Sequence, residues 1–325
     1  MQSKIQNPKS KIEQEFAFAD LIAPLTATTF FDKYWEKQPL LITGREPDYY
    51  ANLFTMSEVG PLLFRGQPGE DLQLAKDHER LPPLQPFDPL KVRQLYHAGY
   101  SIVLNYVFRR HEKLSLFCRS LEDSFHCTVG ANLYLTPRNS RGFKAHYDEH
   151  DVIVLQIDGT KKWYVFDHCT PLLPGKGYSK VLPAEYGQPL PEAQPPLQQE
   201  FWLKPGDCLY LPRGFVHMAH TGPDTHSLHL TFGVHSLSWG QLIASAFEAL
   251  ARHYEPWRHS VPPGFLHNGH AWEAGQEQAA GLAQVLFEQL DTTLNEALAL
   301  NEAGFRQRPE LLPDYRSLFD DSNTP

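Results

Sequence analysis

The stretch HYDEHDVIVLQIDGTKKW, residues 146–163, decides how this chain is interpreted. Residues 147–157 are rich in Val, Ile and Leu without helical periodicity, and Asp158-Gly159 is a dipeptide typical of a tight turn between strands. The stretch therefore predicts a β-hairpin. Because side chains alternate faces along a strand, His146 and Asp148 are expected on the same face. Together they supply two ligands of a candidate metal site.

A third ligand has to come from another strand, and GDCLYLPRGFVHMAHT at residues 206–221 offers His217 directly after a Pro-Arg-Gly turn. His146, Asp148 and His217 would form a two-histidine, one-carboxylate face. Such a face leaves three octahedral positions open, as in non-haem Fe(II) oxygenases and unlike closed zinc sites. The sequence thus predicts a metal centre that keeps room for other ligands.

Other histidines compete for the same role. His220 stands three residues after His217 and could replace it, while His150 is in phase with the first pair, where a polar core contact is the expected role. A histidine two residues before an aspartate also arises by chance in a chain with 16 histidines, so scattered histidines remain the alternative to a metal site.

The two stretches, together with HSLHLTF at residues 226–232, resemble the JmjC-type ribosomal oxygenases, which are cupin-fold Fe(II)- and 2-oxoglutarate-dependent protein hydroxylases. The resemblance is dense in motifs over residues 131–231 and continues more weakly to FFDKYWEKQPLLI at residues 30–42. It implies an α+β fold in which a double-stranded β-helix (a jelly-roll barrel) carries N-terminal helices. A helical dimerisation region would follow the barrel.

The resemblance also implies a role for individual residues. Iron(II) would be held by His146, Asp148 and His217, with no catalytic residue beyond these ligands, and the cosubstrates would be 2-oxoglutarate and O2. Lys161 would anchor the distal carboxylate of 2-oxoglutarate. Further contacts to this cosubstrate would come from residues on two other strands, namely Asn132 and Tyr134 in NLYLTP and His229 in HSLHLTF.

Lys161 can also be weighed on physical grounds, and Gly233 is a departure from the pattern that the resemblance implies. Lys161 stands next to apolar strand residues, where a buried ammonium needs an anionic partner such as a dicarboxylate. The alternative is that Lys161 and Lys162 form a solvated hairpin tip. Gly233 stands where some members of the family carry a serine that helps to hold 2-oxoglutarate, so weaker cosubstrate binding is expected there.

The leading functional hypothesis is an oxygenase that hydroxylates a side chain of a protein or peptide substrate. By resemblance this substrate is a ribosomal protein, and histidine or arginine is the target. One alternative keeps the barrel and metal without 2-oxoglutarate, as an isomerase or hydrolase; a catalytically silent peptide-binding module is another. Lys161 separates the oxygenase from the isomerase or hydrolase, because only a bound dicarboxylate requires a buried lysine. The intact ligand residues argue against the silent module.

Composition restricts the partners. The 325-residue chain has 42% hydrophobic residues, a formal net charge of -9 and a pI of about 6.0, so no basic field is available to hold nucleic acid directly. No apolar run reaches the roughly 18 residues that span a bilayer, and we expect a cytoplasmic protein. The cysteines show no CxxC pair and are expected to be buried apolar residues, with a chance thiol ligand as the alternative: Cys118, Cys127, Cys169 and Cys208.

The order of patterns along the chain predicts its domains. A disordered leader (1–15) precedes an oxygenase domain (16–238), whose barrel occupies about 129–238. Amphipathic helices at 239–254 and 276–300 form the predicted homodimerisation region (239–305), and a tail (306–325) too short for the winged-helix domain common in the family follows. A proline-rich segment at 171–205 is expected on the surface, either as a lid or as a loop without a role.

Overall fold

The computed structural model describes residues 16–65, 71–77, 79–84, 86–168, 195–261 and 269–306. The predicted leader, nearly all of the predicted tail and most of the proline-rich segment lie outside these residues. Within the described part, no helix is long and apolar enough to cross a membrane.

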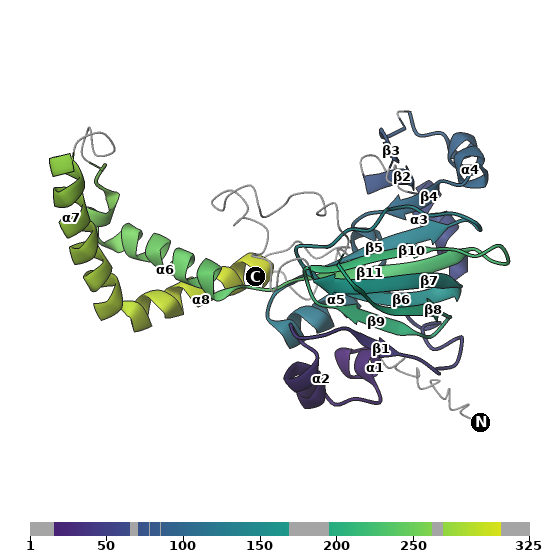
Figure 1. The fold of residues 1–325 in the computed structure, drawn as a ribbon, viewed down its shortest axis with the longest axis horizontal. Coiled ribbons are helices and arrows are strands. Elements are labelled where there is room, and N and C mark those ends of the chain that lie inside the picture. The colour runs from purple at the N-terminus through teal and green to yellow at the C-terminus, as the bar shows by residue number, and fades with distance from the viewer. Residues whose placement is uncertain are drawn as a thin grey trace, which may run out of the picture.

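Two antiparallel sheets form the body of the molecule (Figure 1). The larger sheet has the strand order β1-β9-β6-β11-β5-β4-β2-β3, and the smaller one has the order β10-β7-β8. The strands are β1 (Leu40–Ile42), β2 (Leu72–Lys76), β3 (Glu79–Leu81), β4 (Ser101–Leu104), β5 (Thr128–Thr136), β6 (Asp151–Gly159), β7 (Lys161–His168), β8 (Leu197–Leu203), β9 (Cys208–Leu211), β10 (Phe215–His220) and β11 (Ser227–His235).

The predicted hairpin at residues 146–163 is wrong in two respects. The strand begins at Asp151, so residues 147–150 lie before it, and β6 and β7 belong to different sheets instead of pairing with each other. Gly159 (φ +64°) turns the chain from one sheet into the other, at a point where a Cβ atom would lie 1.9 Å from the carbonyl oxygen of His226. Only glycine fits this corner of the barrel.

The helices that precede β5 in the chain pack against the larger sheet. They are α1 (Phe18–Ile22), α2 (Ala27–Lys33), the 3-10 helix η1 (Met56–Glu58), α3 (Val59–Arg65), α4 (Pro89–His97), the 3-10 helix η3 (Val107–Arg110) and α5 (Glu112–Phe125). Local signals in the sequence account for two of them: Asp88 caps α4 by accepting bonds from the backbone of Leu90 and Lys91, and α5 buries the stripe through Leu114 and Phe117. These helices pack into one core with the sheet.

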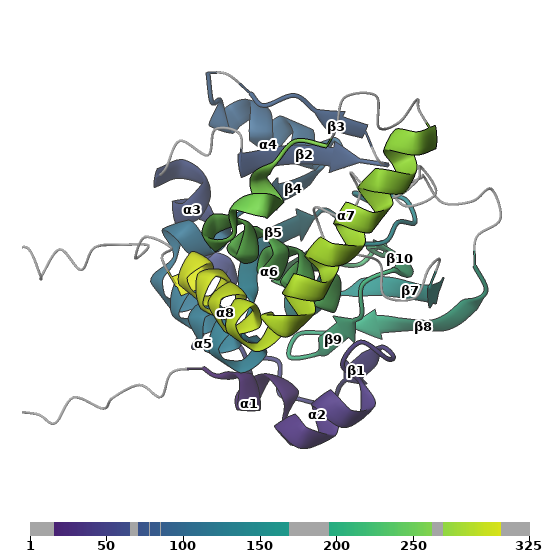
Figure 2. The same ribbon diagram turned by 90° about the vertical axis from the view of Figure 1, so that its left-hand side faces the viewer.

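The C-terminal part is an arm of helices that projects from the barrel, with α7 at its far end (Figure 1). It contains α6 (Trp239–His253), the 3-10 helix η5 (Glu255–Arg258), α7 (Gly269–Glu288) and α8 (Leu290–Arg306). The predicted single helix at 276–300 is wrong, because Gln289 separates two helices. Leu242 and Ala246 of α6 pack with Ala297 of α8, and Figure 2 shows these helices side by side.

Candidate metal centre and adjoining cavity

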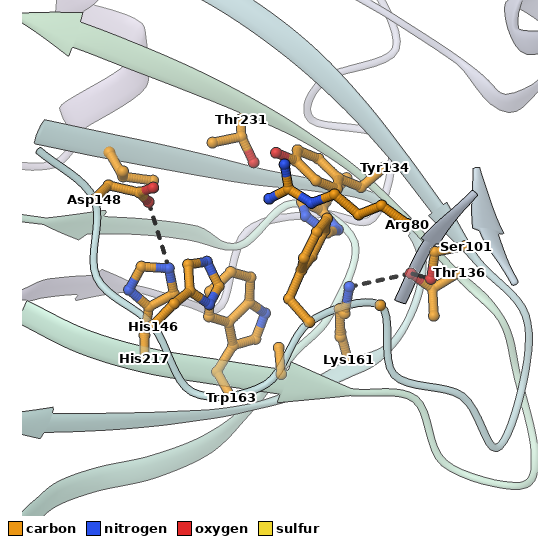
Figure 3. Close-up of a pocket in the computed structure, with 15 residues that line it drawn as sticks. Arg80, Ser101, Tyr134, Thr136, His146, Asp148, Lys161, Trp163, His217 and Thr231 are labelled. Atoms are coloured by element: carbon orange, nitrogen blue, oxygen red, sulfur yellow. Dashed lines mark hydrogen bonds and ion pairs between the residues drawn. The ribbon is translucent and has the colours of Figure 1, made fainter. Parts of the chain in front are cut away.

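A cavity of about 140 Å³ opens between the two sheets, and the predicted metal ligands lie in its wall (Figure 3). We call it the central cavity. Its lining comes from both sheets and from the segment between β5 and β6: Arg80, Ser101, Tyr134, Thr136, Gly142, Phe143, His146, Asp148, Val152, Lys161, Trp163, His217, Ala219, His229 and Thr231. The interior of the barrel therefore holds both polar groups and aromatic rings.

The structure brings together His146, Asp148 and His217, whose ligand atoms all lie within 4.8 Å of one another. His146 and His217 face each other across an isolated bridge in which each backbone N–H donates to the other's carbonyl, at 3.0 and 2.8 Å. The backbone of Asp148 is fixed by a hydrogen bond, in which the N–H of Gly214 donates to the Asp148 carbonyl at 3.0 Å. The short segment before β6 is thus fixed to the start of β10, although it is not the strand that the sequence predicted.

The imidazole rings present the nitrogen that a metal needs. Nδ1 of His146 lies 2.8 Å from the carbonyl oxygen of Lys144, and Nδ1 of His217 lies 3.1 Å from that of Phe215. Because a carbonyl can only accept a hydrogen bond, both Nδ1 atoms carry the proton, and both Nε2 atoms keep a lone pair. Nε2 of His217 lies 3.6 Å from Oδ2 of Asp148.

The protonation states fit a divalent cation as well. Burial, and then the nearby His146, lower the pKa of His217 to about 4. Burial tends to raise the pKa of Asp148, but the surrounding histidines outweigh it, His217 first, and the pKa is lowered. At neutral pH His217 is therefore a neutral imidazole beside a carboxylate, which is the form in which these groups bind metals. The residues present fit an Fe(II) ion.

Behind this centre, a buried ion pair fixes the Pro-Arg-Gly turn that precedes His217. The Arg213 guanidinium lies 2.9 Å from the carboxylate of Asp151 and 2.6 Å from that of Glu36. The hydroxyl of Tyr210 also donates to Asp151, at 3.0 Å. Since a guanidinium held by two carboxylates has one geometry, this network orients the start of β10.

Lys161 lies at the other end of the central cavity and is only 6% exposed. Its Nζ donates to Oγ1 of Thr136 at 3.1 Å, and Ser101 donates to the same oxygen at 3.0 Å. Among the described residues no carboxylate lies within ion-pair distance, and burial lowers the pKa of Lys161 to about 7. The hairpin-tip alternative is wrong for Lys161, because this lysine is buried, whereas the ammonium of its neighbour Lys162 lies 3.6 Å from the carboxylate of Glu200.

The wall between the lysine and the metal centre is aromatic. Tyr134 and His229 stack with ring centroids 4.9 Å apart, and Trp163 meets the edge of His229 at 5.8 Å. Burial, and then the charge of Lys161, lower the pKa of His229, which is neutral at neutral pH. Nδ1 of His229 and Nε1 of Trp163 are buried and have no hydrogen-bond partner among the described residues. A polar molecule in the central cavity could therefore form hydrogen bonds with these two nitrogen atoms.

Three other residues singled out in the sequence do not line the central cavity. Oδ1 of Asn132 accepts from the backbone N–H of Tyr106 at 2.9 Å, so its contact to a cosubstrate stays a prediction. His220 contacts Tyr164 at 3.3 Å and is outside the metal-binding group. The ring of His150 fills the space at Gly233, where a Cβ atom would lie 2.7 Å from it.

Sequence reasoning missed other residues that line the central cavity. Thr136 could have been predicted from the sequence, because it follows Asn132 and Tyr134 at two-residue spacing along β5 and therefore lies on the same face of the strand. Arg80 and Phe143 had no such signal: neither belongs to a motif in the sequence, and only the tertiary structure brings them to the barrel.

Comparisons with known proteins agree with this geometry. The JmjC domain family model matches residues 105–242. The chain is 31% identical over 270 residues to human ribosomal oxygenase 1 (80% of this chain, 41% of that protein). It is 31% identical over 297 residues to ribosomal oxygenase 2 of Rattus norvegicus (84% and 60%). It is 31% identical over 255 residues to the bifunctional lysine-specific demethylase and histidyl-hydroxylase NO66 of Drosophila mojavensis (74% and 28%). The chain thus spans less than two thirds of these relatives.

Solved structures show the same fold. Escherichia coli YcfD, a ribosomal oxygenase, matches with a TM-score of 0.52 at 18% identity, over 79% of this chain and 66% of that one. Its complex with cobalt and 2-oxoglutarate matches with a TM-score of 0.52 at 16% identity, over 85% and 71%. The predicted JmjC-type cupin fold is confirmed.

Proposed function

Because residues 105–242 form a JmjC domain and the chain is homologous to the ribosomal oxygenases, we propose that it is an Fe(II)- and 2-oxoglutarate-dependent protein hydroxylase. The observation that carries the proposal is the pairing of two groups in one cavity. A two-histidine, one-carboxylate centre, with both Nε2 atoms free to bind, faces the same space as a buried lysine that has no carboxylate partner among the described residues. An isomerase or hydrolase would use the first group and not the second.

In this proposal His146, Asp148 and His217 hold Fe(II), and Lys161 binds the distal carboxylate of 2-oxoglutarate. Iron bound there supplies the activation of O2 that converts 2-oxoglutarate to succinate and CO2 and oxidises a C–H bond of the substrate. Because the ammonium of Lys161 lies at the opposite end of the cavity from the metal centre, it determines how long a dicarboxylate can bind between the two. Tyr134, Trp163 and the other rings exclude water from the space between the two ends.

The substrate we propose is a side chain on a ribosomal protein, with histidine or arginine as the target. Support comes from the relatives, whose names include ribosomal oxygenase and histidyl-hydroxylase. The net charge of -9 also favours a basic protein over nucleic acid as the direct partner. Cytoplasmic location stays a prediction from the sequence.

The test is to incubate the purified protein with ribosomal proteins, Fe(II), 2-oxoglutarate and O2, and to measure succinate together with the peptide masses. We expect one peptide to gain a single oxygen atom on a histidine or arginine. The His146→Ala variant, which lacks one of the three protein ligands, should give neither product. Equal succinate formation by this variant would exclude the assigned metal centre.

We further propose that the chain forms a homodimer through α6, α7 and α8. The arm projects from the barrel (Figure 1) and exposes large apolar side chains; among those that the structure describes there, Trp239 (77% exposed) and Phe287 (72% exposed) are the most accessible. Exposed aromatic residues at this density favour association, and a twofold interface would bury each against an identical copy.

A further inference from the structure

Arg80 lines the central cavity although it belongs to β3, the outermost strand of the larger sheet. Figure 3 shows its side chain among the residues that line the cavity, between Tyr134 and Lys161 in this view. Burial raises the pKa of Tyr134 to about 12, and the Arg80 charge opposes that rise, so the guanidinium acts on groups inside the cavity. Arg80 itself is exposed. It therefore stands where a ligand would pass from solvent into the site.

The structure holds this arginine in place. The turn between β2 and β3 is bound to the segment before the metal centre, because the backbone N–H of Asp77 donates to the carbonyl of Arg141 at 2.8 Å and the two side chains form an ion pair at 3.0 Å. That segment carries Phe143, and the Arg80 guanidinium lies 5.2 Å from the centroid of its ring. Arg80 is thus positioned over the central cavity by contacts on both sides.

The charges around the cavity leave Arg80 available to an anion. Among the described residues no carboxylate lies within ion-pair distance of Arg80, whereas Arg110 and Arg141 each have an aspartate partner. Among the described residues that line the cavity, Asp148 is the one carboxylate, and it belongs to the candidate metal centre. The lining therefore carries more positive than negative groups once a divalent cation is bound.

The two basic residues differ in how they carry their charge. A guanidinium is protonated at every physiological pH, whereas burial lowers the pKa of Lys161 to about 7, so that before a ligand arrives the lysine is only partly charged at neutral pH. An incoming dicarboxylate would therefore meet a permanent charge first and the buried lysine second.

We propose, on the basis of the proposed function, that Arg80 is a second anion-binding residue of the cosubstrate site and binds a carboxylate of 2-oxoglutarate at the mouth of the central cavity. In this arrangement Lys161 fixes the distal carboxylate at the closed end. Arg80 attracts the dianion from solvent and then retains it. The carboxylate of an acidic residue in the protein substrate is the other source of such a group, and the experiment separates the two.

The test is calorimetric titration of 2-oxoglutarate into the Mn²⁺-loaded protein under argon, so that binding is measured without turnover. We expect Arg80→Gln to weaken binding about three- to tenfold, because the lost charge is partly screened by solvent. Arg80→Lys, which keeps the charge, should recover most of the affinity. Raising the salt concentration should weaken 2-oxoglutarate binding by the unmodified protein more than it weakens binding by Arg80→Gln.

Arg109→Gln is the matched control. Arg109 is also exposed and lies over an aromatic ring, 4.3 Å from the centroid of Tyr106, but it does not line the central cavity. Its loss should leave the affinity for 2-oxoglutarate unchanged. Neither Arg109→Gln nor Arg80→Gln should change the affinity for Mn²⁺.

The inference is overturned if Arg80→Gln binds 2-oxoglutarate as tightly as the unmodified protein. If that variant has a weaker affinity for the protein substrate alone, the arginine belongs to the site of that substrate. The proposed function survives either outcome. It fails, together with the inference, if the unmodified Mn²⁺-loaded protein does not bind 2-oxoglutarate.

Discussion

Lys161 and Lys162 show how one position along a strand decides the role of a residue. They are adjacent in β7, so their side chains point to opposite faces of the smaller sheet. Lys161 enters the central cavity and contacts Thr136, whereas Lys162 lies over the ring of Tyr164 and pairs with Glu200. The sequence could place two lysines after a turn, but only the register of the strand determines which of them is buried.

We expect Lys161→Ala to weaken the binding of 2-oxoglutarate about ten- to a hundredfold, since a buried charge-assisted pair contributes about 1.5 to 3 kcal/mol. Metal binding should persist, because the three ligands lie at the other end of the cavity. Calorimetry on the Mn²⁺-loaded protein measures both. Lys162→Ala is the control on the opposite face, and equal losses in the two variants would mean that neither lysine binds the cosubstrate.

The pH dependence of binding follows from the same lysine. Its pKa is lowered by burial to about 7 in the ligand-free protein, and a bound carboxylate favours the protonated form. Binding above pH 7 therefore takes up a proton. The affinity for 2-oxoglutarate should be greatest below pH 7 and should fall as the pH rises above it, by up to about tenfold per pH unit.

Titrations in buffers of different ionisation enthalpy would detect the proton uptake directly. A Lys161→Arg variant keeps its charge across this range, so any cosubstrate binding that it retains should not depend on pH there. A pH-independent affinity in the unmodified protein would show that Lys161 is already charged before the ligand binds.

At the scale of elements, the corner between β6 and β7 decides the architecture. Because Gly159 and Thr160 carry the chain into the other sheet, His217 on β10 and Lys161 on β7 share one sheet and face the strands that carry Tyr134 and His229. Thr160 is fixed there by its backbone N–H, which donates to the carbonyl of His226 at 3.0 Å. The cavity exists because the chain changes sheets at this point.

Gly159→Ala should destabilise the fold by about 2 to 4 kcal/mol, because the added methyl group clashes with the His226 carbonyl and the backbone has positive φ. Thermal or urea unfolding would measure the loss. Gly60→Ala in α3 is the control: nothing lies within 4 Å of its Cβ position, and alanine favours a helix, so its stability should be unchanged or higher. A Gly159→Ala protein of full stability would contradict the close approach.

The elements also show where sequence reasoning ends. Helix α5 and the start of α4 were predictable, because an apolar stripe and an N-terminal cap are local signals. The grouping of the three candidate ligands was predictable from residue type and motif. The sheet change at Gly159 was not, since a strand, a glycine turn and a second strand also describe a hairpin. Arg80 was missed for a related reason: its place in the cavity depends on contacts between Asp77 and Arg141, far apart in the chain.

At the scale of the whole molecule, the barrel and the helical arm differ in how completely they bury their apolar side chains. The barrel and its N-terminal helices share an extended core, whereas the small cluster in the arm is built from Leu242, Ala246 and Ala297. Alanine contributes little apolar area, so the contacts within one arm bury little surface. A second copy of the chain would supply the missing burial, which is the physical reason for the proposed homodimer.

We therefore expect a dimer by light scattering at micromolar concentration, and we expect Trp239→Glu and Phe287→Glu to give folded monomers, because both side chains are exposed within one chain. Leu286 is only 3% exposed, so Leu286→Glu should lower the melting temperature of the arm by placing a charge in its interior. The contrast between Leu286 and its neighbour Phe287 separates an interface from an internal core. A monomeric mass for the unmodified protein would reject the dimer. If Trp239→Glu and Phe287→Glu both remain dimers, the interface lies elsewhere than on this face of the arm.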